Sequence, residues 1–235
     1  MSQMIEEIKM VLRKKAVIFE TGGIRPTCEL GESWIGKVAW QNPGETLPMG
    51  QNNKPMVPIA TMFVEESNYI PEALQGIKLI TVFMDFEFWN NLGAGDYKDF
   101  FEIRTYTSLD NLEKCDYTSE EILPFPLVAK KVENEFPQWE DLGDSNEPLF
   151  DIILKLEKDE GVDYYTDIFE ENNSCHKFGG YPSTIQGGMC FDDGYEFVMQ
   201  ISSDEKADMN IVDGGNFYFA YNKETKTWRV GCDFY

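Results

Sequence analysis

The sequence predicts an α+β protein that is mostly antiparallel β-sheet, with one N-terminal helix and a pair of helices near the middle. Three observations favour this class. Segments rich in β-branched and aromatic residues alternate with Gly, Pro and Asn turns toward both ends of the chain. Apolar residues recur at helical spacing at the N-terminus and in the central region. The 235 residues, 42% of them hydrophobic, are enough to bury the core of a single domain over residues 1–235.

The N-terminal segment MSQMIEEIKMVLRKK predicts an amphipathic helix. It lacks the basic-then-apolar order and the small-residue cleavage site of a signal peptide. Charged residues separate the apolar residues that share one helical face: Met4, Ile5, Ile8, Val11 and Leu12.

The first half, residues 16–110, predicts strands separated by irregular stretches. Its β-rich segment 16–21 stops at a Gly-Gly turn signal. The Pro- and Asn-rich stretch 41–58 predicts a loop, and PEALQ at 71–75 predicts a short helical turn. Further strands are expected within 59–66, 77–89 and 99–108.

The middle of the chain, residues 111–174, predicts an acidic, helical connection. Within 145–161 apolar residues share one face, Pro148 suits the first turn and Gly161 suits the stop. A second short helix follows, with Asp163 as its cap.

The second half, residues 175–235, predicts strands again, at 196–203, 215–222 and 227–234. The second half contains the same succession of a hydrophobic residue with glycine, a proline-containing loop and two strands as the first half. Ile35-Gly36, a Pro-rich loop and two strands correspond to Phe178-Gly179, Pro182 and two strands. We therefore expect two pseudo-repeated β-rich halves packed face to face.

The formal net charge is −22, and residues 132–172 carry fourteen acids against two lysines. Such a field repels nucleic acid and anionic membranes, so neither is expected as a partner, and it attracts basic proteins. Simple solubility is the alternative explanation of the acidity. The five cysteines are odd in number and include no C-x-x-C pair, which favours reduced thiols and a cytoplasmic location.

No catalytic set, cofactor or metal site is predicted. His176, the one histidine of the sequence, follows Cys175. Adjacent residues on an extended chain point to opposite faces, so this pair is badly placed as nucleophile and base. A general base with a distant partner is the alternative role for His176. The Gly-Gly pairs at 179–180 and 187–188 lack the spacing of a phosphate-binding loop.

The stretch CHKFGGYPSTIQGG, residues 175–188, is interpreted as a structural corner that leads into the second β unit. Gly179 and Gly180 are expected in conformations unfavourable to residues with a Cβ, and Pro182 is expected to fix the exit direction. His176 is expected to be partly exposed or to bond a backbone group, so its replacement by alanine should leave folding nearly unchanged.

Two further features belong to the second half. Asp213-Gly214-Gly215 is interpreted as a hairpin turn in which Asp213 caps its own backbone. Gln200 lies in an otherwise apolar segment, where a buried amide must find partners in the protein or in a ligand.

Three segments of the second half, HKFGGYP, FVMQISSD and DGGNFYFAYN, resemble the C-terminal signature of the YwqG-like proteins, a bacterial domain family without assigned function. The first half departs from the family pattern, because Lys37 replaces a glycine, Ala39 a proline and Thr61 a glutamine. The resemblance implies a mixed α+β, largely antiparallel fold and a cytoplasmic protein, and it implies no reaction. The matching positions are Lys177, Gly179, Gly180, Pro182, Gln200, Ile201, Asp213, Gly214 and Gly215.

Two functions are compatible with these observations. The first is a non-enzymatic binding protein, of immunity or inhibitor type, that presents an acidic face to a basic protein partner. The alternative is a small-molecule-binding protein or an enzyme that uses the cleft between the two halves. Its ligand-binding residues are expected on the rim of the second half: Lys177, Gln186, Gln200, Asp213 and Tyr218.

Overall fold

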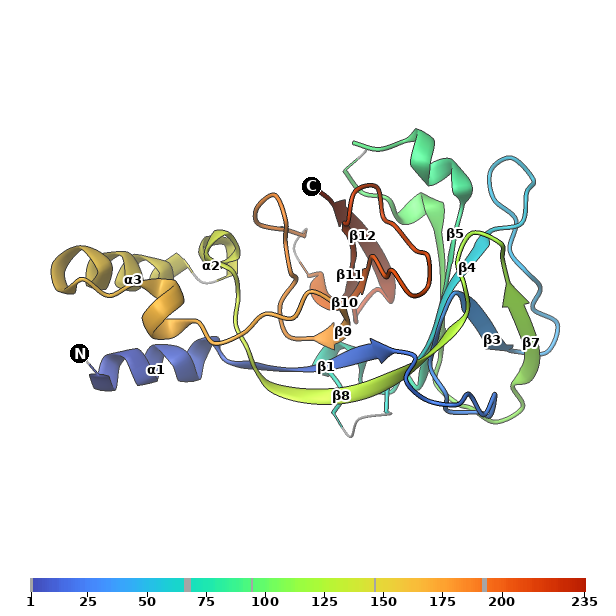
Figure 1. Ribbon diagram of the computed structural model, residues 1–235, viewed down its shortest axis with the longest axis horizontal. Coiled ribbons are helices and arrows are strands. Elements are labelled where there is room, and N and C mark those ends of the chain that lie inside the picture. The colour runs from blue at the N-terminus through green and yellow to red at the C-terminus, as the bar shows by residue number, and fades with distance from the viewer. Residues whose placement is uncertain (1, 66–68, 94, 146, 192–193) are drawn as a thin grey trace.

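The computed structural model describes residues 2–65, 69–93, 95–145, 147–191 and 194–235. Its main feature is a ten-stranded antiparallel sheet with the order β12-β11-β10-β9-β1-β8-β2-β4-β5-β6 (Figure 1). A two-stranded sheet pairs β3 (Lys37–Gln41) with β7 (Glu113–Thr118). The strands of the large sheet are β1 (Lys14–Thr21), β2 (Trp34–Ile35), β4 (Val57–Phe63), β5 (Leu79–Met84), β6 (Phe101–Tyr106), β8 (Phe125–Glu135), β9 (His176–Gly179), β10 (Glu196–Ser202), β11 (Asn216–Asn222) and β12 (Thr227–Asp233).

The helices lie at the N-terminus and in the middle of the chain, so the expected mostly antiparallel β fold with few helices is confirmed. Short 3₁₀ turns occur between the strands. The helical elements are α1 (Ser2–Leu12), α2 (Trp139–Ser145), α3 (Glu147–Glu160) and a π-helical turn, η4 (Tyr164–Ile168). The 3₁₀ turns are η1 (Glu72–Leu74), η2 (Phe86–Asn90) and η3 (Lys98–Phe100).

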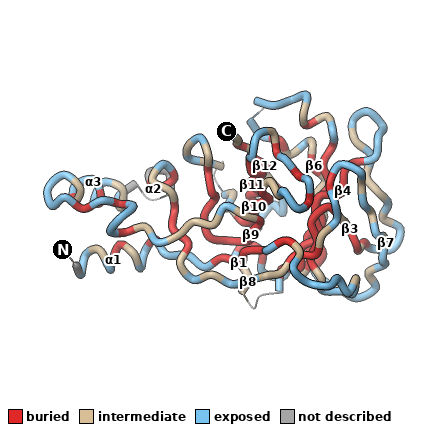
Figure 2. Tube along the Cα trace, viewed as in Figure 1, coloured by how far each residue is buried: buried red, intermediate tan, exposed pale blue. Residues whose placement is uncertain are grey.

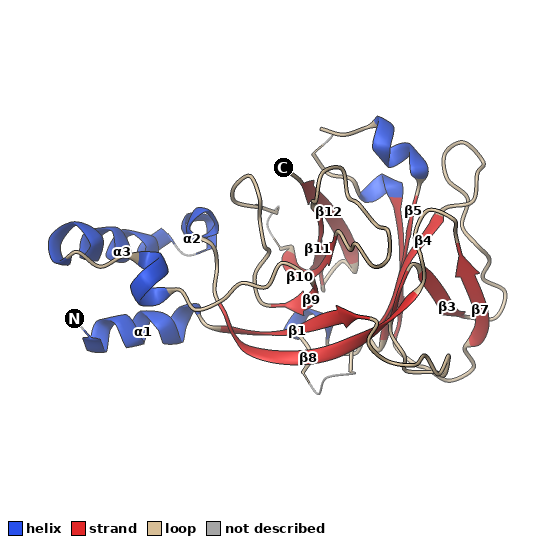
Figure 3. Cartoon of the chain, in the orientation of Figure 1, coloured by secondary structure: helices blue, strands red, loops and turns tan. Residues whose placement is uncertain are grey.

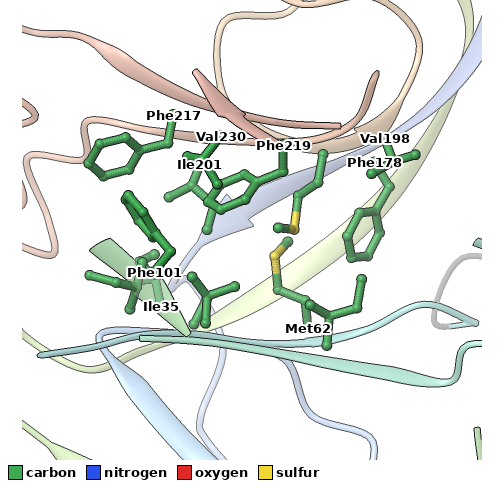
Figure 4. Packing of buried hydrophobic residues seen from close by; sticks show 14 of the residues in the cluster. Ile35, Met62, Phe101, Phe178, Val198, Ile201, Phe217, Phe219 and Val230 are labelled. Carbon is green, nitrogen blue, oxygen red and sulfur yellow. The ribbon is translucent and has the colours of Figure 1, made fainter. Parts of the chain in front are cut away.

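The large sheet folds over so that β6, at one edge, faces the β10–β12 arm. The Phe101 ring, from β6, packs edge-to-face on Phe217 and Phe219 of β11, with centroids 5.0 and 5.7 Å apart. Figure 4 shows these rings between the two arms of the sheet, with Ile35 and Met62 facing Ile201 and Val230. Edge-to-face contacts add to the free energy of burial, so this aromatic cluster holds the sheet nearly closed.

The outer edge of β12 is covered by the segment before β6. The Val230 N–H donates to Asp96 Oδ1 (3.1 Å), and the Tyr97 N–H donates to the Val230 carbonyl (2.8 Å). Asp96 also pairs with Arg229 at 2.7 Å. Backbone groups that would otherwise be open for pairing are thereby satisfied.

The helices form a separate lobe, residues 2–13 and 136–171, which projects from one end of the β body (Figures 1 and 3). We call it the helical lobe. Figure 2 shows buried residues concentrated in the β body and alternating with exposed ones along the helices. The lobe has its own core, to which α1, α3 and η4 contribute: Ile8, Leu12, Phe136, Leu142, Ile153, Leu156, Val162, Tyr164 and Ile168.

Several local expectations hold. Gly161 follows α3 with φ +70°, and the Asp163 side chain caps η4 by accepting from the Thr166 N–H at 2.9 Å. The structure differs for residues 111–174, because this expected helical connection also contains β7 and the central strand β8. It differs again after Met84, where the expected strand ends and Asp85 caps η2.

No helix in the described part of the chain is long and apolar enough to cross a membrane.

Candidate functional site

The corner at residues 175–188 begins inside the sheet, because its first residues form β9 between β1 and β10. Gly179, the last residue of β9, and Gly180 after it have φ of +69° and +66°, as expected. A Cβ at Gly180 would lie 2.9 Å from Glu135 Cγ. Pro182 is buried, and its carbonyl accepts a hydrogen bond from Asn172 Nδ2 (3.1 Å). The corner is therefore a tightly packed part of the β body.

His176 is buried, with 3% of its surface exposed, and both ring nitrogens are engaged. The Ser202 N–H donates to Nδ1 at 3.1 Å, which confirms the expected bond to a backbone group. Because Nδ1 accepts, Nε2 carries the proton and donates to Asp204 Oδ2 at 3.1 Å. Neither nitrogen is left to act as a base. Because the ring is buried and bonded at both nitrogens, the structure argues against the expectation that alanine replacement leaves folding nearly unchanged.

The acid and the thiol beside His176 have shifted pKa values. Burial alone would raise the pKa of Asp204, but hydrogen bonds from His176, Thr21 and the Ala207 N–H outweigh it and hold the pKa well below its usual value. Burial raises the pKa of Cys175 to about 11, so its thiol is protonated at neutral pH and is a poor nucleophile.

Lys177 is fully buried and forms an ion pair with buried Glu135. Its Nζ lies 2.9 Å from Glu135 Oε2, 3.0 Å from Asn172 Oδ1 and 2.9 Å from Ser183 Oγ. Three acceptors match the three N–H groups of an ammonium. Burial lowers the pKa of Lys177, and the Glu135 carboxylate opposes that shift.

Ser183 joins the buried polar residues of the second half into one network. Gln200 Oε1 accepts from the Ser183 N–H (2.8 Å), and Gln200 Nε2 donates to Ser202 Oγ (3.0 Å). The Ser183 carbonyl accepts from Asn216 Nδ2 (3.0 Å) and lies 2.8 Å from the Tyr218 hydroxyl. Lys177, Gln200 and Tyr218, three of the predicted ligand-binding residues, thus meet in this network with protein partners.

A serine beside a lysine can form a nucleophile and base pair in some enzymes. Here the Lys177 Nζ is engaged by Glu135, Asn172 and Ser183 together, and Ser183 is 2% exposed. The network therefore fixes the corner against the sheet.

The other two predicted residues lie outside this network. Gln186 is exposed, and its side-chain Nε2 donates to the Phe234 carbonyl. Asp213 is exposed at the end of a loop that spans residues 203–215, so the segment is no tight hairpin. Asn210 Oδ1 accepts from the Gly214 N–H (2.9 Å). Gly215 packs so closely that a Cβ would lie 2.3 Å from the Asp233 carbonyl oxygen.

A small cavity of about 220 Å³ does lie between the two halves. Its lining includes residues of the first half, such as Ile59 and Trp89, and residues of the second half, such as Met209 and Phe217. None of the five predicted ligand-binding residues lines this cavity, and most of its lining is apolar.

The acidic stretch identified in the sequence folds mainly into the helical lobe. Of the acidic residues in this stretch that the structure describes, Glu135 and Asp141 are buried. Burial raises the pKa of Asp141 to about 6. Among the residues of 136–171 whose side chains the structure describes, the exposed acids are Glu140, Asp151, Asp159, Glu160, Asp163, Asp167 and Glu170.

Sequence reasoning missed Glu135, Asn172 and Ser183. No spacing motif connects Glu135 to Lys177, which lies 42 residues further along the chain. Their contact follows from the places of β8 and β9 on either side of β1.

The fold and the corner define an antiparallel β protein with a nearly closed sheet, a helical lobe and a buried polar corner. The chain belongs to the family described as Domain of unknown function (DUF1963), whose sequence profile matches residues 40–226. No curated protein matches the chain.

Proposed function

We propose that this protein is a non-enzymatic binding protein, of immunity or inhibitor type, that presents the acidic helical lobe to a basic protein partner. The observation that carries the proposal is the gathering of exposed acids on one projecting lobe of a chain with net charge −22. Charge of one sign steers association with a partner of the opposite sign.

The test compares two triple variants with the same change in formal charge. The lobe variant carries Asp151→Asn, Asp159→Asn and Glu160→Gln. The body variant carries Glu20→Gln, Glu205→Gln and Glu224→Gln, at exposed positions of the β body.

Each protein is used as bait in a native lysate at low and at high salt. We expect the wild type and the body variant to retain a partner at low salt and the lobe variant to lose it. The absence of a salt-sensitive partner, or equal loss in both variants, would overturn the proposal.

We further propose that the protein is a bacterial, YwqG-like member of its family and acts in the cytoplasm. The signature at residues 176–182 supports the first part. The five cysteines, all of them free thiols, support the second.

We also propose that the two halves arose by duplication. The strand order supports this, because β9–β12 follow β1 outward as β2, β4, β5 and β6 follow β8. Gly36, directly after β2, and Gly179, the last residue of β9, have φ of +70° and +69°.

The cavity between the halves supports the second candidate, a small-molecule-binding protein or enzyme. Its size and apolar lining suit a small apolar ligand. A thermal-shift screen with small aromatic and aliphatic compounds tests this candidate, and unchanged melting temperatures with all of them would leave it without support.

A further inference from the structure

Only some of the apolar side chains on α1 are buried in the core of the lobe. Ile8 and Leu12 are buried, whereas Met4 and Val11 are 46% and 61% exposed. On α3, Ile153 is buried and its neighbour Ile152 is 45% exposed. Two helices of one lobe therefore leave aliphatic side chains in water.

These side chains line a groove between α1 and α3 that encloses about 500 Å³. Its apolar lining is Met4, Ile8, Val11, Leu149, Ile152 and Leu156. Methionine and leucine side chains on two helices adapt readily to the apolar face of a third helix.

The charged residues of the same groove are mainly acidic. Glu7, Asp159 and Glu160 line it together with one basic residue, Lys155. An apolar floor with acidic edges complements a helix whose apolar stripe is flanked by Lys and Arg.

We propose that this groove, termed the α1–α3 groove, binds a basic amphipathic helix of the partner protein. The inference rests on the proposed function and gives the acidic lobe a defined contact site. The 11 residues of α1 span about 16 Å, so the bound helix needs about three turns.

Charge argues against two other occupants. A second copy would bring Glu7, Asp159 and Glu160 of both molecules together, and each molecule already carries a net charge of −22. An anionic membrane surface would be repelled by the same residues.

The probes are synthetic peptides of about fourteen residues, long enough to cover the groove. The ordered lysine peptide contains leucine and lysine, with leucines at positions i, i+3, i+4 and i+7. The scrambled lysine peptide has the same composition in another order. The glutamate peptide is the ordered peptide with every lysine replaced by glutamate. Binding is measured by fluorescence anisotropy, and peptide helicity by circular dichroism.

The groove variant carries Val11→Ser and Ile152→Ser, at positions already exposed in the fold. The matched control carries Ile24→Ser and Leu30→Ser, which are 47% and 43% exposed on the β body. We expect the ordered lysine peptide to bind as a helix and the groove variant to weaken it about tenfold or more. The control should bind as the wild type does.

Equal binding of the ordered and scrambled lysine peptides would overturn the proposal that the groove binds a helix. The acidic lobe would then remain a binding surface for basic proteins. Binding of neither lysine peptide at low salt would overturn the proposed function as well. Tight binding of the glutamate peptide, or a wild-type dimer that the groove variant converts to a monomer, would assign the groove to another occupant and overturn the inference.

Discussion

At the scale of single residues, the corner depends on the absence of a side chain at Gly180. Its φ is +66°, and a Cβ would approach Glu135 Cγ to 2.9 Å, beside the buried ion pair. We expect Gly180→Ala to lower the free energy of unfolding by more than about 1 kcal/mol. Urea denaturation measures this change. Gly76→Ala is the control, because Gly76 has φ +85° with open space around it, and an equal effect of the two would exclude crowding at Gly180.

His176 is a second residue on which the corner depends. Replacement by alanine removes two hydrogen bonds, leaves the Ser202 N–H buried without its acceptor, and opens a cavity. We expect His176→Ala to destabilise the fold by about 2 kcal/mol in urea denaturation. Cys175→Ala, at the half-buried neighbouring position, should have a smaller effect. A His176→Ala protein as stable as the wild type would contradict the role of the histidine in holding β9 to β10.

Asp141 predicts a dependence of stability on pH. It accepts hydrogen bonds from Thr184 Oγ1 (2.9 Å) and the Met189 N–H (3.1 Å), yet burial raises its pKa to about 6. The pKa of Asp141 is higher in the folded than in the unfolded protein. Between these two pKa values, the folded protein therefore binds more protons than the unfolded one. The free energy of unfolding consequently falls as the pH rises through about 4 to 6.

Asp141→Asn removes this titration. We therefore expect the stability of Asp141→Asn relative to wild type to rise by on the order of 1 kcal/mol between pH 4.5 and 7.5. Urea denaturation at both pH values measures the difference. Asp151→Asn, at an exposed position of α3, should show no comparable change. A pH-independent difference for Asp141→Asn would show that the carboxyl titrates normally.

At the scale of elements, the Lys177–Glu135 ion pair connects β9 to β8 across β1. Removing one partner leaves the other charge buried and unpaired, so Lys177→Met or Glu135→Leu alone should destabilise by about 3–5 kcal/mol. The double variant leaves neither charge and should be more stable than either single variant. Denaturation of the four proteins forms a double-mutant cycle, and additive losses would mean that the pair is not coupled.

Local patterns predicted those elements whose stability is local. The caps and stops of α3 and η4 lie in the sequence next to the residues they serve, so Gly161 and Asp163 could be assigned from sequence. β8 could not, because its second part, AKKVENE, is charged and becomes a strand through its pairing with β1. β9 is four residues long and its sequence resembles a turn, since the strand ends at Gly179 and Gly180 follows directly.

At the scale of the whole molecule, the polar network of the corner was predictable in part. Gln200 was predicted to need polar partners, whereas Lys177 and Tyr218 were predicted as ligand-binding residues on the rim of the second half. Their actual partners come from β8, from the segment after η4 and from β12, which only the ten-stranded sheet brings together. The closing contact of Phe101 with Phe217 likewise joins strands from opposite arms of the sheet.

The last prediction concerns how the net charge of −22 is distributed over the molecule. Like charges repel in the folded state, and dissolved salt screens that repulsion, so the melting temperature should rise with NaCl. In the helical lobe, many exposed acidic residues lie within a small part of the chain. The lobe variant should therefore gain more in melting temperature at low salt than the body variant, by about 2–4 °C for each kcal/mol of repulsion removed. Thermal denaturation of both variants and the wild type at low and high NaCl measures this. Both variants remove the same number of charges. Equal gains in melting temperature would therefore mean that the acids of the lobe repel one another no more than those of the β body. In that case a basic partner would relieve no excess repulsion by binding to the lobe.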